Sequence, residues 1–152
     1  MLGGLSAIKG MDAFEACVRD AAARELPLHF HVLGHVSRPL EVDEGAPVTV
    51  TGSYEDARLA TLAALERPDA FLFLSQVPES YSYTLTVAMQ SGKPILATQL
   101  GAFVERLRGY PGAALVPAGA SARTINDTLL RLAQAGASPM PARPVAVSVH
   151  RA

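Results

Sequence analysis

The sequence lacks the features that would place it among disulfide-stabilised, membrane-spanning or secreted proteins. Its 152 residues include one cysteine, Cys17, which cannot form a disulfide within the chain, so a reducing compartment is the simpler expectation. No apolar run reaches the ~20 residues needed to cross a bilayer, and the N-terminus has no signal-peptide pattern. We therefore expect a cytoplasmic protein without a membrane span.

Charge is scarce and nearly balanced. Charged residues make up 18% of the chain, and 13 Lys and Arg against 14 Asp and Glu leave a formal net charge of −1. There is no run of Lys and Arg, so nothing favours nucleic acid or an anionic membrane as a partner. With 49% hydrophobic residues, the composition is that of one folded globular domain.

Short apolar runs alternate with segments of helical periodicity. Runs bounded by Gly, Pro or Asp predict buried strands at 28–33, 48–51, 70–74, 94–98 and 113–116. Met1 and Leu2, which precede a glycine turn, resemble the stub of a further strand and suggest a chain cut from a longer one. We therefore expect about six strands.

Helices are predicted between these strands. Phe14, Cys17, Val18 and Ala21 form one apolar helix face, as do Ile125, Leu129, Leu132 and Ala133 after a possible N-cap at Ser121. Further helices are expected at 55–66, 83–91 and 101–108. The alternation predicts a doubly wound α/β domain, a Rossmann-like parallel sheet with helices on both faces. It spans 1–135, and a Pro/Ala-rich tail follows at 136–152.

The segment from Pro78 to Pro94 carries the strongest functional signal. It follows one predicted strand and precedes another, so it forms a strand-to-helix connection at the ligand-binding edge of the sheet. Free backbone N–H groups at that helix start can bind phosphate or sugar oxygens. Glu79 lies just ahead, where its carboxylate can accept hydrogen bonds from two sugar hydroxyls.

This segment resembles the donor-binding motif of the GT-B glycosyltransferases of the group 1, family-4-like class. Glu79 matches the first of two glutamates in that motif, and Ser91-Gly92-Lys93-Pro94 matches the exit of its helix. Val87 stands where the second glutamate, which usually holds the nucleotide ribose, would be. By the resemblance, Glu79 is the catalytic-site residue that positions the sugar.

The N-terminal turn agrees with the same family. Residues 3–10, Gly-Gly-Leu-Ser-Ala-Ile-Lys-Gly, resemble the family's Gly-Arg-Leu-x-x-x-Lys-Gly turn, whose Arg and Lys neutralise the donor diphosphate. Lys9 matches, whereas Gly4 replaces the Arg and would let backbone N–H groups approach instead. Residues 31–35, 48–54 and 101–107 resemble later motifs of the family, and they occur in the same order. The resemblance covers about residues 3 to 133.

The resemblance assigns donor contacts to a set of residues at the carboxyl edge of the sheet. They are Gly4, Lys9, Gly34, His35, Gly52, Ser53, Tyr54, Tyr81, Ser82, Tyr83 and Thr84. Lys9 and the backbone of 82–84 would hold the diphosphate, and 52–54 would border the base. Of the alternating Tyr81 and Tyr83, we expect one ring inward and one near the cleft.

A metal site is not expected, nor any other cofactor. His29 and His31 share one strand face, as metal ligands can, but no Asp, Glu or Cys clusters beside them in the sequence. Helices should also cover both faces of an interior strand. His35 follows Gly34 at the strand end and is placed to face the cleft. Cys17, on an apolar helix face, is expected to be inert core.

The sequence thus predicts the donor-binding domain of a glycosyltransferase, one half of a GT-B architecture. By the resemblance, its partners are a nucleotide-sugar donor and a missing N-terminal domain that binds the acceptor. The full-length protein would be cytoplasmic or peripheral to the inner membrane. Two alternatives stay open: a degenerate, non-catalytic sugar-nucleotide-binding or scaffold module, and a sugar-nucleotide epimerase of the same fold.

Overall fold

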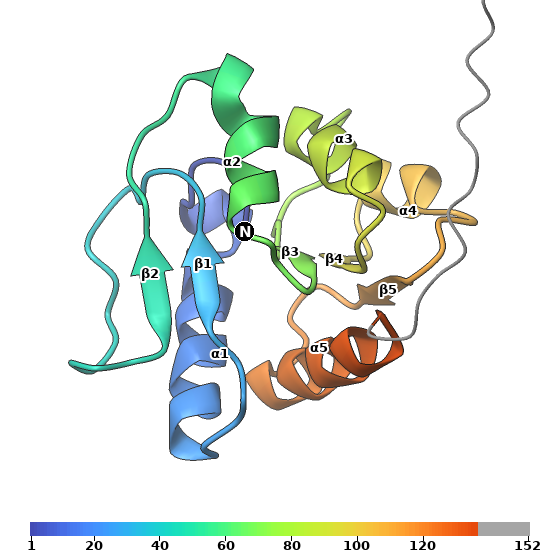
Figure 1. Ribbon diagram of the computed structural model, residues 1–152. Helices are drawn as coiled ribbons and strands as arrows, with labels where there is room; N and C mark the ends of the chain where they lie inside the picture. The colour runs from blue at the N-terminus through green and yellow to red at the C-terminus, as the bar shows by residue number, and fades with distance from the viewer. Residues whose placement is uncertain (137–152) are drawn as a thin grey trace, which may run out of the picture.

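Parallel strands form the centre of the molecule in the computed structural model, which describes residues 1–136 (Figure 1). β1 (Phe30–Val32) pairs with β2 (Val48–Val50). β3 (Phe71–Phe73), β4 (Ile95–Thr98) and β5 (Ala113–Val116) pair in that order. All pairings are parallel, and each strand lies within a run predicted from the sequence. The described residues hold five strands, against the expected six or so.

The first residues of the chain extend the sheet beside β1. Leu2 and Leu5 form isolated parallel bridges with Leu33 and Val36. The amide of Gly3 donates to the carbonyl of Leu33 at 2.9 Å. The strand stub expected at the N-terminus is therefore present as an extended segment, although it is too short to count as a strand.

Helices connect the strands close to the predicted limits. The helical elements are η1 (Ala7–Lys9), α1 (Met11–Ala23), η2 (Asp56–Arg58), α2 (Leu59–Leu65), α3 (Tyr83–Gln90), α4 (Ala102–Arg106) and α5 (Ala122–Gly136). The predicted N-cap of α5 is confirmed, because the amide of Thr124 donates to Ser121 Oγ at 3.2 Å.

β3 and β4 bury both of their faces, as parallel strands between two helical layers do. Leu72 and Leu96 pack into one core with residues of α1 and α5. Their strand neighbours Phe71 and Ile95 point the other way, into a second core with α2, α3 and α4. Figure 1 shows the two helical layers on opposite sides of the strands. The doubly wound, Rossmann-like prediction is confirmed.

A buried polar contact joins α1 to α5. Asn126 is fully buried, and its side-chain amide donates to the carbonyl of Cys17 at 2.9 Å and to the carboxylate of Asp20 at 2.8 Å. Arg24 then bridges Asp20 and Asp127. Burial raises the pKa of the Cys17 thiol to about 12, which keeps it protonated and agrees with the expected inert core position.

The predicted Pro/Ala-rich tail at 136–152 lies, apart from its first residue, outside the described residues. The expected domain at 1–135 corresponds to nearly all of the part that is described.

Candidate functional site

The loops that follow the carboxyl ends of the strands meet around the N-terminal glycine turn. A Cβ added to Gly3 would lie 3.2 Å from the methyl group of Thr84 and 3.8 Å from the hydroxyl of Tyr54. A Cβ on Gly4 would lie 2.6 Å from Cε1 of His35. Three of the predicted donor-contacting residues, from three separate segments, therefore gather within van der Waals reach of the turn that contains a fourth, Gly4.

Gly34 lets two of these segments pack backbone against backbone. Its φ is +149°, and a Cβ there would clash with the carbonyl oxygen of Gly3. Its own carbonyl accepts a hydrogen bond from the amide of Gly52 at 3.1 Å. The predicted residues Gly34 and Gly52 thus bring the end of β1 and the loop after β2 together. Ser53 is exposed, and Tyr54 is half-buried.

Lys9 and Glu79 form the charged pair of the site. Lys9 Nζ lies 3.8 Å from Glu79 Oε1, although 70 residues separate them in the sequence (79 minus 9). The Lys9 side chain is 39% exposed and that of Glu79 18%, so the cation is the more accessible partner. The structure brings these two predicted residues together at the same edge of the sheet.

A chain of hydrogen bonds supports the carboxylate of Glu79. The Ser75 hydroxyl donates to Glu79 Oε1 at 2.7 Å, and the Ser75 carbonyl accepts from the Thr98 hydroxyl at 2.8 Å. Ser75, which is 3% exposed, lies two residues after β3. Thr98, which is 2% exposed, is the last residue of β4. The motifs did not single out either residue. The available signal was a hydroxyl directly at the carboxyl end of an apolar run.

The backbone of η1 is anchored to the same region. The amide of Gln76 donates to the carbonyl of Ile8 at 2.8 Å. Gly10 ends η1 with a φ of 83° and approaches Leu74, the residue after β3, so closely that a Cβ there would lie 2.7 Å from Cβ of Leu74. Lys9 therefore lies between two residues, Ile8 and Gly10, that both contact the segment that follows β3.

The start of α3 faces this edge of the sheet. Ser82 is the N-cap residue but makes no side-chain capping bond, and its hydroxyl lies 3.3 Å from that of Thr84. α3 has eight residues, and the first N–H groups of an α-helix have no acceptor within the helix, so they can bind a ligand. Oriented N–H groups at a helix start favour anionic ligands such as phosphate.

The expectation of one inward tyrosine ring was wrong. Tyr81 and Tyr83 are 58% and 59% exposed. The Tyr81 ring stacks under the guanidinium carbon of Arg106, 4.4 Å from the ring centroid. The Ser82 backbone turns to φ 63° between the two tyrosines, and Tyr83 begins α3, so the alternation with serine does not bury one ring.

A family comparison identifies the class of this chain. Residues 1–135 match the family model described as "Glycosyl transferases group 1". The chain belongs to the group 1 glycosyl transferases. A comparison with curated proteins found no match.

Solved structures with the same fold include several members of this class. The crystal structure of TarM has a TM-score of 0.68 and 14% identity, covering 90% of this chain and 28% of that one. The C-terminal domain of a glycosyl transferase group 1 family protein (LpcC) from Francisella tularensis has a TM-score of 0.65 and 19% identity, covering 88% and 73%.

A third neighbour was solved with a ligand. Anabaena Alr3699/HepE in complex with UDP-glucose has a TM-score of 0.62 and 21% identity, covering 88% of this chain and 39% of that one. Identities this low show the fold alone. The chain thus spans 28% of TarM and 39% of HepE. By contrast, it covers 73% of the isolated C-terminal domain of LpcC.

The glycosyl transferase chain departs from the motif it resembles at Val87. The Val87 side chain is 7% exposed and packs in the core that α2, α3 and α4 share. Valine has no hydrogen-bonding group, so this position cannot supply the ribose contact that the resemblance assigns to a glutamate.

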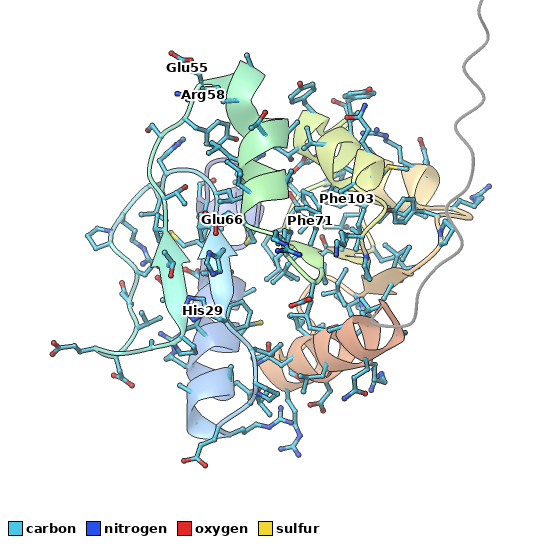
Figure 2. All side chains as sticks on the ribbon, in the orientation of Figure 1. His29, Glu55, Arg58, Glu66, Phe71 and Phe103 are labelled. Carbon is cyan, nitrogen blue, oxygen red and sulfur yellow. The ribbon has the colours of Figure 1, made fainter. Side chains whose placement is uncertain are left out.

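A cavity of about 360 Å³ lies at the other end of the strands, and its lining includes none of the predicted site residues. Phe71 of β3, His29 and Glu66 at the end of α2 contribute to it (Figure 2). His31 Nδ1 lies 3.3 Å from Glu66, and His29 is exposed rather than covered by a helix. The expectation that helices cover both faces there was therefore wrong for His29.

Residues 1–136 contain neither a metal-ligating cluster nor a membrane-spanning helix. Among residues 1–136, no three His, Cys, Asp or Glu side chains are arranged to hold a metal ion. No helix within that same part of the chain is long and apolar enough to cross a membrane.

Proposed function

We propose that this chain is the donor-binding domain of a two-domain glycosyltransferase and binds a nucleoside diphosphate sugar. Membership of the group 1 glycosyl transferases supports the class. The observation that carries the proposal is the Lys9–Glu79 pair, with Ser75 behind the carboxylate and the start of α3 beside it. This arrangement offers a cation, oriented N–H groups and a carboxylate at one edge of the sheet.

The diphosphate would be bound by Lys9 and by the N–H groups of residues 82–84. Lys9 is 39% exposed and can move from Glu79 to a phosphate oxygen without crossing the core. Fixed positive charge next to the leaving diphosphate stabilises the negative charge that develops as the glycosyl bond breaks. Since Lys9 and the helix start supply this stabilisation, the proposal includes no metal ion.

The sugar and the nucleoside would lie on either side of the diphosphate. Glu79 accepts hydrogen bonds through its carboxylate and would hold two sugar hydroxyls. Gly52, Ser53 and Tyr54, in the loop after β2, would border the base. HepE was solved with UDP and with UDP-glucose, so these are the first donors to test.

The acceptor would be bound by a second domain that this chain does not contain. The chain spans 28% of TarM and 39% of HepE, which leaves room in those proteins for another domain. We therefore expect the chain alone, a cytoplasmic protein in this proposal, to bind donor and to transfer little sugar.

A second candidate is a binding module of this family without catalysis. It is favoured by Val87, which is buried in the core, and by Gly4, because each replaces a polar contact that the resemblance leads one to expect. Both candidates predict donor binding. They differ in whether the chain, combined with an acceptor domain, transfers sugar.

Calorimetric titration with UDP, UDP-glucose and GDP in the presence of EDTA tests the proposal. The wild-type chain should bind at least one of them saturably, and Lys9→Ala should weaken that binding by about tenfold, a loss typical of a charge-assisted contact. The matched control is Lys93→Ala, which removes an exposed lysine just before β4, at the opposite edge of the sheet. Equal losses in both variants, or no saturable binding by the wild type, would contradict the proposal.

A further inference from the structure

Arg106, the last residue of α4, holds the loop that leads into α3. Its Nη1 donates to the carbonyl of Tyr81 at 2.7 Å and to the carbonyl of Ser82 at 2.9 Å. Its Nη2 donates to the hydroxyl of Thr86 at 2.8 Å. The guanidinium also stacks on the Tyr81 ring. One half-buried side chain thus contacts three of the six residues from 81 to 86.

The backbone that Arg106 holds is in an unfavourable conformation. Ser82 has φ 63° and ψ 90°, and its side chain makes no capping bond to α3. A non-glycine residue at positive φ is strained, so it persists only where its surroundings stabilise it. The two hydrogen bonds from Arg106 supply that stabilisation, because they hold the carbonyls of Tyr81 and Ser82, one before and one after the Ser82 Cα.

The same bonds determine where the amide groups point. In a trans peptide the C=O and the following N–H point in opposite directions. Because the carbonyls of Tyr81 and Ser82 face Arg106, the N–H groups of Ser82 and Tyr83 face away from it. These are the N–H groups at the start of α3.

The side of α3 away from Arg106 is the side of the glycine turn. Thr86 contacts Arg106, whereas the methyl group of Thr84 lies 3.2 Å from the place that a Cβ on Gly3 would take. Two residues along an α-helix correspond to a rotation of about 200°, so Thr84 and Thr86 lie on opposite faces. Arg106 therefore turns the N–H groups of Ser82 and Tyr83 toward Gly3, where the donor-contacting residues gather.

α4 also holds the other end of this loop. The amide of Ala102 donates to the carbonyl of Glu79 at 2.8 Å. Gly101 has φ 49° and packs so closely that a Cβ there would lie 2.6 Å from the same carbonyl oxygen. The loop from Glu79 to Ser82 is thus fixed to one segment, 101–106, at both of its ends.

We propose that Arg106 is a positioning residue for the diphosphate, acting through the backbone of Ser82 and Tyr83 rather than through contact with the donor. The inference rests on the proposed donor site. It requires the planar fork of arginine, because a lysine ammonium keeps the charge but cannot hold two carbonyls, a hydroxyl and a tyrosine ring together.

Titration of UDP, or of GDP if the wild type prefers it, into Arg106→Lys and Arg106→Ala tests this role. Both variants should bind the nucleotide at least about tenfold more weakly than the wild type. The control is Arg108→Ala, which removes the same charge from an exposed residue two positions later and should change affinity by less than about twofold. Wild-type affinity in Arg106→Lys would overturn the inference.

Amide resonances separate positioning from general stability. In the wild type, the nucleotide should shift the amide resonances of Ser82 and Tyr83. In the free Arg106→Lys variant these two resonances should already be displaced, while those of β4 stay in place. Unmoved Ser82 and Tyr83 resonances on saturation of the wild type would overturn the inference even if a variant failed to fold.

The two proposals fail in different ways. A wild type that binds neither UDP nor GDP contradicts the donor site and this inference with it. A wild type that binds, is weakened by Lys9→Ala and is unaffected by Arg106→Lys contradicts only the role of Arg106.

Discussion

The imidazole of His35 lies against the backbone of Gly4, so that a Cβ added to Gly4 would come within 2.6 Å of Cε1 and 2.9 Å of Nε2. The family resemblance places an arginine at position 4, and a side chain there would require the His35 ring to move. Gly4 and His35 are thus coupled: the absence of a side chain at one position makes room for the ring at the other. This ring brings a hydrogen-bonding nitrogen to the glycine turn.

His35→Ala should weaken the binding of UDP by about three- to tenfold, because it removes one hydrogen-bonding group from the proposed diphosphate site. Gly4→Ala should have a similar effect, because the added methyl group displaces the ring. Calorimetry measures both. The control is His29→Ala, an exposed histidine at the other end of β1. Wild-type affinity in both Gly4→Ala and His35→Ala would show that the ring does not contact the donor.

Ser75→Ala should separate sugar binding from nucleotide binding. The Ser75 hydroxyl donates to Glu79 Oε1, and Glu79 is proposed to hold the sugar. The variant should therefore lose about three- to tenfold in affinity for UDP-glucose, the value of one charge-assisted hydrogen bond, and little for UDP.

Ser91→Ala is the matched control for Ser75→Ala. It removes a hydroxyl that bonds the carbonyl of Ala88 at the end of α3. Equal losses for UDP and UDP-glucose in Ser75→Ala would argue that Glu79 acts on the nucleotide or on folding instead of on the sugar.

Gly10→Ala should destabilise the fold by at least about 2 kcal/mol, since it adds a methyl group at positive φ against the backbone of Leu74. Gly109→Ala is the control, because Gly109 also has a positive φ (+74°) but nothing within 4 Å of its missing Cβ. Its cost should be about 1 kcal/mol, the strain alone. Urea unfolding measures both, and equal costs would contradict a close approach of Gly10 to Leu74.

The course of the fold was largely predictable from the sequence because parallel strands buried on both faces are short apolar runs. The β5 run at 113–116 was predicted with the limits that the structure has. The β1 run was predicted at 28–33, whereas the strand spans Phe30–Val32. The predicted run begins earlier than the strand because it included His29. That residue is exposed in the structure, and the sequence pattern did not show this.

The site was predictable only where a local motif marks it. Lys9, Glu79 and the glycines follow strand ends in recognisable patterns, and the structure gathers them. Arg106 and Thr98 carry no motif of their own. Their roles depend on which carbonyl or hydroxyl the fold brings to them, 24 residues away for Arg106 and Ser82 and 23 for Thr98 and Ser75. Tertiary contacts of this kind have no sequence spacing to read.

An ion pair near α1 should make stability depend on pH at the acid end. Glu15 is buried, and Arg38 donates to both of its carboxylate oxygens, at 2.6 and 3.1 Å. The hydrogen bonds from Arg38, with the amide of Glu41, hold the pKa of Glu15 below its ordinary value of 4.5. Because the pKa of Glu15 is lower in the folded state, the ion pair stabilises the fold above pH 4.5, and this stabilisation is lost as the pH falls below that value.

Glu15→Gln should therefore lower the free energy of unfolding at pH 7 by about 1–3 kcal/mol, as for hydrogen bonds to a charged group. The difference from the wild type should shrink as the pH falls below 4.5. Thermal unfolding across this range measures it. A difference that stays constant down to the lowest pH at which the wild type folds would exclude the ionised pair as its source.

A crystal structure of the wild-type chain with UDP-glucose tests the central claim most directly. The account predicts the diphosphate within ion-pair distance of Lys9 Nζ, at the N–H groups of 82–84, and the sugar hydroxyls on the carboxylate of Glu79. UDP-glucose bound instead in the cavity beside His29 and Phe71, or a chain that stays empty at saturating UDP-glucose, would contradict it.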